Sequence, residues 1–218
     1  MTANTSARDR LTAALTRIDD SAGQGRFACL TVYRDSAQRE AAAADARAAA
    51  GQSRGSLDGA IVSIKDLFDV AGEVTRAGSR ILAEEGVPAE RDAPVIARLR
   101  AAGAVIVAKT NMTEFAFSGV GENPHYGTPG IPADRNRVPG GSSSGAAVAV
   151  ADGMCEIAIG SDTGGSTRIP AALTGTVGFK PSKPRVPTDG VFPLSTTLDS
   201  IGPLAMTVQR CADADAVM

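Results

Sequence analysis

The chain has 218 residues, of which 43% are hydrophobic and 21% charged, and its 24 acidic and 22 basic residues give a net charge of −2. This near-neutral balance provides no basic field for a phosphate backbone, so we expect no nucleic-acid partner. No stretch approaches the roughly 18 to 20 apolar residues needed to cross a bilayer, and no apolar core follows the charged N-terminus. The composition therefore predicts a soluble, cytoplasmic protein with no membrane partner.

The counts of cysteine and histidine exclude several kinds of site. Cys29, Cys155 and Cys211 are odd in number and share no C-x-x-C spacing, so they predict three separate buried thiols without a disulfide framework or a zinc knuckle. His125 is the single histidine, which excludes a zinc hydrolase built on two or three imidazoles. We expect no metal and no cofactor.

The first part of the chain is predicted to be mainly helical. Apolar residues recur at helical spacing in residues 5–20, and residues 36–50 are rich in alanine, which favours a surface helix. Between them, residues 27–33 (FACLTVY) have the character of a short strand.

From Leu57 onward, short β-branched runs alternate with helical segments. Strands are predicted at AIVSI, AVIVA and CEIAIG. Helices are predicted over residues 92–102 with Asp92 as the N-cap, near Met112, over residues 146–154, and from Thr207 onward. Residues 181–203 are rich in proline and are predicted to form an ordered loop. The alternation favours an α/β sandwich with a largely buried sheet.

Two glycine-rich loops, residues 140–145 and 162–166, suggest phosphate binding, because amides at a helix N-terminus cradle phosphates. Their spacing excludes it, since no glycine precedes a lysine and no G-x-G-x-x-G follows a strand. The first loop also matches G-x-S-x-G, which would make Ser143 the nucleophile of an α/β-hydrolase. However, Pro139 stands where that motif needs a strand, and His125 precedes the serine instead of following it. We interpret this match as a coincidence of serine richness.

Lysine is the remaining candidate for a general base. Lys65 follows the apolar run AIVSI and precedes DLFDV, so its side chain is expected to be buried. Strand alternation points Lys65 and Asp66 to opposite faces, which leaves the ammonium without its nearest carboxylate. Desolvation would lower the pKa of Lys65, so that the amine could accept a proton near neutral pH. A buried structural salt bridge is the alternative.

Ser166 is the candidate nucleophile. It follows Gly164 and Gly165 at the carboxyl end of a predicted buried strand, where side chains reach a crevice. Two glycines allow backbone amides to point toward one spot, as an oxyanion hole requires. An N-cap serine in a tight strand-to-helix turn fits the same pattern, and the residues alone do not separate the two interpretations.

Several segments together resemble the amidase signature family. Residues 139–171, PGGSSSGAAVAVADGMCEIAIGSDTGGSTRIPA, are similar to its signature segment, and LDGAIVSIKDLFDVAG, NPHYGTP, VGFKPS and TLDSIGP match in the same order. The resemblance covers most of the chain from Leu57 and is specific, because independent motifs agree in sequence and spacing. It implies one incomplete amidase signature domain over residues 1–218, with N-terminal helices to about residue 55 and a catalytic core from about residue 56. The implied fold is an α/β/α sandwich with a mixed central sheet, whose C-terminal part is missing from this chain.

The resemblance also implies a catalytic site. The family's lysine falls on Lys65, its bridging serine, which follows a cis peptide bond, on Ser142, and its nucleophile on Ser166. The implied oxyanion-hole amides are those of Thr163, Gly164, Gly165 and Ser166. By the same match, Ser143 and Ser144 start a helix and His125 is a structural bystander. Arg168 is interpreted as an ion-pair organiser with Asp162 as its partner, and binding of a substrate carboxylate is the alternative. Asp199 is interpreted as a loop anchor in preference to an acid.

The implied function is hydrolysis of a small-molecule amide through an acyl-enzyme on Ser166. The same residues serve the A subunit of the glutamine-dependent tRNA amidotransferase, which is the first alternative. A catalytically silent, truncated fragment is the second alternative. Because family chains are about twice this length, we expect a homodimer or a complementing C-terminal chain as the partner.

Overall fold

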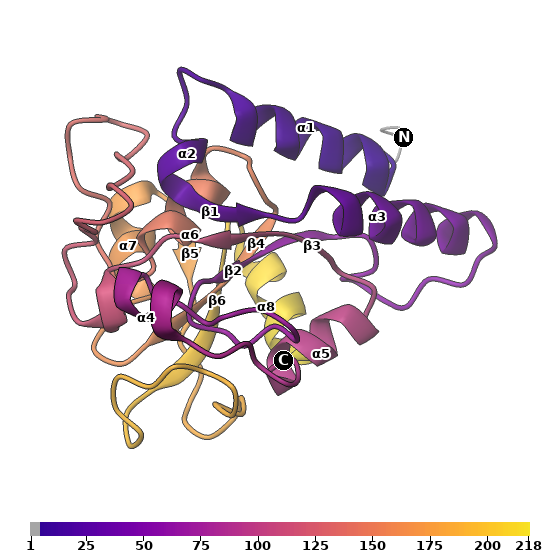
Figure 1. Cartoon of the computed structure of the whole chain (residues 1–218). Helices are drawn as coiled ribbons and strands as arrows, with labels where there is room; N and C mark the ends of the chain where they lie inside the picture. The colour runs from indigo at the N-terminus through magenta and orange to yellow at the C-terminus, as the bar shows by residue number, and fades with distance from the viewer. Residues whose placement is uncertain (1–4) are drawn as a thin grey trace.

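A mixed six-stranded β-sheet forms the centre of the molecule (Figure 1). The structure is a computed structural model that describes residues 5–218. The strands are β1 (Cys29–Val32), β2 (Ile61–Lys65), β3 (Val105–Thr110), β4 (Ile157–Asp162), β5 (Val177–Gly178) and β6 (Ser200–Ala205), in the order β1-β3-β2-β4-β6-β5. Strands β3, β2 and β4 run parallel, whereas β1, β6 and β5 pair antiparallel with their neighbours. The predicted mixed sheet is confirmed.

Helices cover both faces of this sheet. They are α1 (Ala7–Asp19), α2 (Gly25–Ala28), α3 (Arg34–Ala49), α4 (Arg80–Glu85), α5 (Pro94–Ala101), α6 (Ser144–Ala151), α7 (Arg168–Thr174), α8 (Val208–Val217) and the 3₁₀ turn η1 (Glu114–Ala116). One face is covered by α1, α3 and α6, and the other by α5 and α8, as in the predicted sandwich (Figure 1). No helix in the described part of the chain combines the length and the apolar character needed to span a membrane.

Both predicted N-terminal helices are present, as α1 and α3. Ser6 caps α1 by accepting the amide hydrogen of Asp9 at 3.1 Å. In α3, Ala37, Ala41 and Ala44 recur at helical spacing and are buried against the sheet. Small side chains let α3 approach the sheet closely while its other side remains exposed, so it is the predicted surface helix.

Helix α6 differs from the others because it is buried on every side. All residues from Ser144 to Val150 are buried, and a helix without a polar face belongs in a core. It packs against β2, β3, β4 and β6. A glycine is required at its start, because a Cβ at Gly145 would lie 2.4 Å from Ala28 O and 2.6 Å from Asn111 N.

The prediction that Asp92 caps a helix is wrong. The N-cap of α5 is Ala93, and Pro94 occupies the first turn, where its missing N–H costs nothing. The Asp92 carboxylate accepts hydrogen bonds from the Ala71 amide at 2.9 Å and from Arg100 Nε at 3.1 Å. The Asp92 carboxylate is therefore occupied by Ala71 and Arg100 and does not cap the helix.

The helix expected near Met112 is also absent from the described chain. Only η1 forms there, and Phe115 within it has a left-handed φ of 54°. The Asn111 side chain accepts the Met112 amide at 2.8 Å and donates to Gly127 O at 2.8 Å. Such side-chain bonds to the backbone compete with helix formation.

The prediction of an uninterrupted loop over residues 181–203 is wrong at its end, where β6 begins at Ser200. Pro203 lies within β6 opposite Ile159 of β4, and a proline in a run argues against a strand when only the sequence is read. Strand β5 has two residues, too few for a recognisable pattern. The strand expected over residues 27–33 is shorter, because its first two residues end α2.

The start of α6 gives a stability prediction. We expect Gly145→Ala to lower the free energy of unfolding by about 1–3 kcal/mol, because the added methyl group meets backbone atoms that cannot move aside. Gly175→Ala is the comparison, since Gly175 has a φ of +75° but open space around it, and we expect it to lose about 1 kcal/mol. Urea unfolding measures both, and an equal or smaller loss at Gly145 would contradict the steric explanation.

Candidate active site

Lys65 lies at the carboxyl end of β2, between β3 and β4, and its side chain is fully buried. Its Nζ donates to Ser142 Oγ at 2.7 Å and to Ser161 Oγ at 2.8 Å. Asp66 points elsewhere, toward Arg76, as strand alternation predicted. The hydrogen-bond partners of Lys65 are thus hydroxyl groups and not a carboxylate, which argues against the structural salt bridge.

Burial lowers the pKa of Lys65 from its ordinary value to about 7. The negative charges of Asp162 and Asp199 act in the opposite direction and raise the pKa, but they do not compensate for the lost hydration. A lysine with this pKa is substantially neutral at physiological pH, so it can accept a proton.

Ser142 is held in place by backbone bonds on both sides. The peptide bond between Gly141 and Ser142 is cis, the conformation that the resemblance implied. The Gly141 amide donates to Gly119 O at 2.8 Å, and Ser142 O accepts the Thr113 amide at 3.1 Å. These bonds position the loop so that Ser142 Oγ faces the Lys65 amine.

Ser166 lies beside the Ser142 loop. The Ser143 amide donates to Ser166 O at 3.1 Å, which ties the two glycine-rich loops together. The two serine side chains are not hydrogen-bonded to each other. Among residues 5–218, Ser142 Oγ is linked to Lys65 but not to Ser166 Oγ. The structure therefore brings Lys65 and Ser142 into contact and places Ser166 next to them. Catalytic hydrogen bonds often tighten only when substrate is bound.

Asp162 organises the turn that carries Ser166. Its buried carboxylate accepts the Gly165 amide at 2.8 Å and the Thr167 amide at 3.1 Å. Arg168 donates to the same group through Nε at 3.0 Å and Nη2 at 2.9 Å, which is the predicted pairing. Burial alone would raise the pKa of Asp162, but the hydrogen bond from Arg168 and the amide bonds hold that pKa below its ordinary value.

The four amides predicted for an oxyanion hole are not equivalent. The Gly165 amide is engaged by Asp162, so it orients the turn in this structure. The amides of Thr163, Gly164 and Ser166 remain candidates. Gly164 has no atom within 4 Å of the position of a Cβ, so one side of the turn is open to an approaching group.

Asp199 anchors two loops, the role expected for it. Its carboxylate accepts the hydroxyl of Thr163 and the amides of Leu194 and Ser195, both at 2.9 Å. Thr163 begins the glycine turn, so Asp199 fixes this turn against the proline-rich segment.

The other side chains singled out in the sequence lie apart from these contacts. His125 Nε2 lies 3.3 Å from Glu114, and both side chains are partly exposed. Ser143 is the N-cap residue of α6 and Ser144 its first residue. The three cysteines are free and buried, as predicted.

Ser161 is a functional candidate that the sequence analysis missed. It is the second acceptor for Lys65 Nζ, and it lies in β4, immediately before Asp162. A polar residue inside the buried run IAIGSD was the available signal. That signal could not show which neighbouring strand the hydroxyl would face.

The fold and these contacts define a class: α/β sandwich proteins in which a buried lysine, rather than a histidine, is the candidate base. Comparison with known families gives the particular family. The family model for amidases matches residues 9–218, and the chain belongs to this family.

Individual relatives support this assignment. The glutamyl-tRNA(Gln) amidotransferase A chain of Anaeromyxobacter dehalogenans is 49% identical over 208 residues, which are 95% of this chain and 42% of that protein. AtzE, a 1-carboxybiuret hydrolase component from Pseudomonas sp. (strain ADP), is 43% identical over 209 residues, 95% of this chain and 45% of that protein. The solved peptide amidase of Stenotrophomonas maltophilia has a TM-score of 0.88 at 36% identity and covers 98% of this chain and 44% of its own. The chain therefore spans less than half the length of these relatives.

The environment of Lys65 predicts its titration. In protein labelled with ¹³C-lysine, we expect the resonance that is lost in Lys65→Met to titrate with a midpoint of about 7. Asp199→Asn keeps the hydrogen-bonding shape but removes a charge that raises the pKa, so the midpoint should fall. The control is Asp189→Asn, an exposed aspartate of the same loop, which should leave the midpoint unchanged. A higher midpoint in Asp199→Asn would contradict this electrostatic account.

Proposed function

We propose that the protein is a cytoplasmic amidase that hydrolyses the C–N bond of a small-molecule carboxamide. Ser166 is the nucleophile, and Lys65 acts as its base through Ser142. The observation that carries this proposal is the buried Lys65 amine, 2.7 Å from Ser142 Oγ, with a pKa of about 7. Membership of the amidase family supports the same reaction class.

The first chemical step forms a tetrahedral intermediate on Ser166. Neutral Lys65 takes the proton of Ser142 while Ser142 takes that of Ser166, and Ser166 Oγ attacks the amide carbonyl. The amides of Thr163, Gly164 and Ser166 stabilise the negative charge on the carbonyl oxygen, an effect of about 3 to 4 kcal/mol per donor. The contact between Ser142 and Ser166 has to close when substrate binds.

The second step releases both products. The lysine ammonium returns its proton through Ser142 to the leaving nitrogen, because an amide anion is too poor a leaving group. The C–N bond breaks and the amine departs, which leaves the acyl-enzyme on Ser166. Water then gives a proton to the same relay, attacks the acyl-enzyme, and releases the carboxylic acid and Ser166.

More than half of the length of the amidotransferase and hydrolase relatives lies outside the matched region. We propose that polypeptide outside residues 1–218, whether continuous with this chain, a complementing polypeptide or a second copy, supplies the remaining wall of the substrate pocket.

The corresponding component of a glutamine-dependent tRNA amidotransferase is the second candidate function, because a relative of that name is 49% identical. Release of ammonia from glutamine, in preference to simple aliphatic amides, would favour it.

A covalent probe tests the proposed nucleophile. We expect a phosphonofluoridate to form an adduct on Ser166, identified by mass spectrometry of the digested full chain. Ser166→Ala should abolish the adduct, and Lys65→Met should slow its formation at pH 7.5 by at least a thousandfold, because no base remains. His125→Ala is the control and should react like the parent. Loss of labelling in the histidine variant but not in Lys65→Met would overturn the relay, and a parent chain that does not react would favour the silent fragment.

The second hydroxyl at Lys65 gives a further prediction. Ser161→Ala removes one of two hydrogen bonds that orient the amine, so we expect labelling of Ser166 to slow by about five- to tenfold. Ser63→Ala is the matched control, since this buried serine of β2 contacts Cys155 Sγ at 3.2 Å and not Lys65. Equal effects of both substitutions on the labelling rate would show that Ser161 has no specific role.

A further inference from the structure

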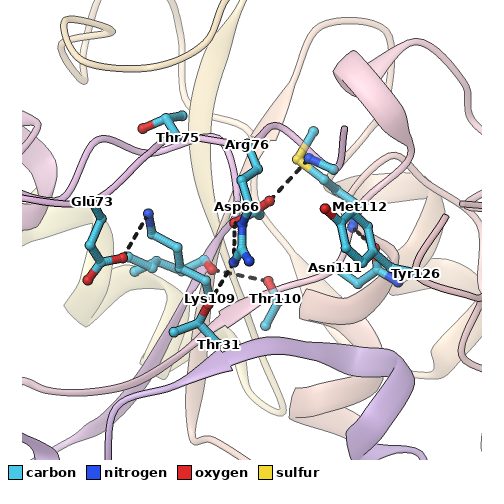
Figure 2. Close-up of polar contacts among 12 residues, drawn as sticks. Thr31, Asp66, Glu73, Thr75, Arg76, Lys109, Thr110, Asn111, Met112 and Tyr126 are labelled. Atoms are coloured by element: carbon cyan, nitrogen blue, oxygen red, sulfur yellow. Dashed lines mark hydrogen bonds and ion pairs between the residues drawn. The ribbon is translucent and has the colours of Figure 1, made fainter. Parts of the chain in front are cut away.

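Figure 2 shows a second polar cluster, which the proposed mechanism does not use. By strand alternation it lies on the side of β2 and β3 opposite to Lys65, because Lys109 pairs with Ile64 and Asp66 follows Lys65. Its members are Asp66, Arg76, Thr31, Lys109 and Glu73. Asp66 and Lys109 are fully buried. Burying charges costs free energy unless they are paired, so this arrangement requires a physical explanation.

Asp66 follows Lys65 directly, and all of its polar groups are engaged. One carboxylate oxygen accepts Arg76 Nη2 at 3.1 Å and Nε at 3.3 Å, and the other accepts the Gly78 amide at 3.1 Å. Its main chain donates to Thr110 O at 3.1 Å and accepts the Ala77 amide at 2.9 Å. The residue after the candidate base is therefore fixed in both its side chain and its backbone.

Arg76 extends this attachment to the edge of the sheet. Its Nη2 donates to Thr31 Oγ1 of β1 at 2.6 Å (Figure 2). Thr31 pairs with Lys109 of β3, whose Nζ lies 3.2 Å from Glu73, and Glu73 also accepts the hydroxyl of Tyr33 at 2.6 Å. The cluster thus joins three strands and the loop over residues 73–78 at the end of β2.

The cluster has little direct electrostatic influence on Lys65. The charges that shift the pKa of Lys65 are those of Asp162 on β4 and Asp199 before β6. Burial raises the pKa of Asp66, and Arg76 and the Gly78 amide oppose this shift. Any effect of the Asp66–Arg76 pair on Lys65 is therefore expected to act through the position of the backbone.

We propose that Asp66 and Arg76 are positioning residues for Lys65. From the opposite face of the sheet, they hold the end of β2 so that Nζ meets Ser142 in a site closed to water. This inference rests on the proposed function. Misplacement of a reacting group by about 1 Å can cost a hundredfold in rate, so a fixed Cα position matters for a side chain as long as lysine.

The test removes both charges together, because a single deletion would leave the other charge buried and unpaired. In the full chain, we expect Asp66→Asn/Arg76→Met to slow phosphonofluoridate labelling of Ser166 at pH 7.5 by at least tenfold. A looser β2 would admit water to Lys65, so its pKa should rise from about 7 toward the ordinary value. The acid limb of the labelling rate against pH should therefore move to higher pH by at least half a unit.

The other end of β2 offers a matched control. Arg47 Nε lies 3.1 Å from both oxygens of the buried Asp58 carboxylate, three residues before the strand begins. Asp58→Asn/Arg47→Met removes the same kind of pair at the start of β2, whereas Lys65 is the last residue of that strand. We expect a lower melting temperature and an unshifted pH profile.

Three outcomes decide the inference. An unshifted profile in the folded Asp66→Asn/Arg76→Met variant, or an equal shift in the control, overturns it. If that variant does not fold, Arg76→Lys decides, because it keeps the charge but loses the planar fork, and we expect a smaller shift in the same direction. A parent chain that is not labelled on Ser166 overturns the proposed function instead.

Discussion

The site depends on an amine that is held where water cannot hydrate it. Lys65 lies on a central strand with helices over both faces of the sheet, and its nitrogen meets two hydroxyl groups and no carboxylate. An ammonium ion there would lose its hydration and gain no directly paired charge, so the fold favours the neutral amine. A chain whose single histidine lies elsewhere thereby obtains a group that can accept a proton at neutral pH.

The two carboxylates that act on this amine also shape the backbone around it. Asp162 holds the turn before Ser166, and Asp199 holds the segment that packs beside that turn. Their charges raise the pKa of Lys65, and their oxygens accept hydrogen bonds from other donors and not from the amine. The same two groups therefore fix the loops and partly offset the effect of burial on the pKa of the amine.

Local sequence patterns predicted the three parallel strands β2, β3 and β4 and the burial of Lys65, because β-branched runs and the residues flanking a strand carry that information. The same patterns failed at β6, where Pro203 hides a strand, and at Asp92, whose partners Ala71 and Arg100 come from elsewhere in the chain. Pairing with Ser142, 77 positions further along, came from the family resemblance and not from local chemistry. Ser161 was missed because its role depends on which strand lies beside β2.

Arg168 gives the site a connection to the surface. Its guanidinium is about half exposed, whereas the carboxylate that it neutralises is fully buried and acts on Lys65. Salt or a bound anion can therefore compete with Asp162 for the exposed Arg168, and Asp162 in turn raises the pKa of the buried Lys65 amine. A change in the solution around Arg168 can thus alter the pKa of Lys65, although the Lys65 side chain is itself fully buried.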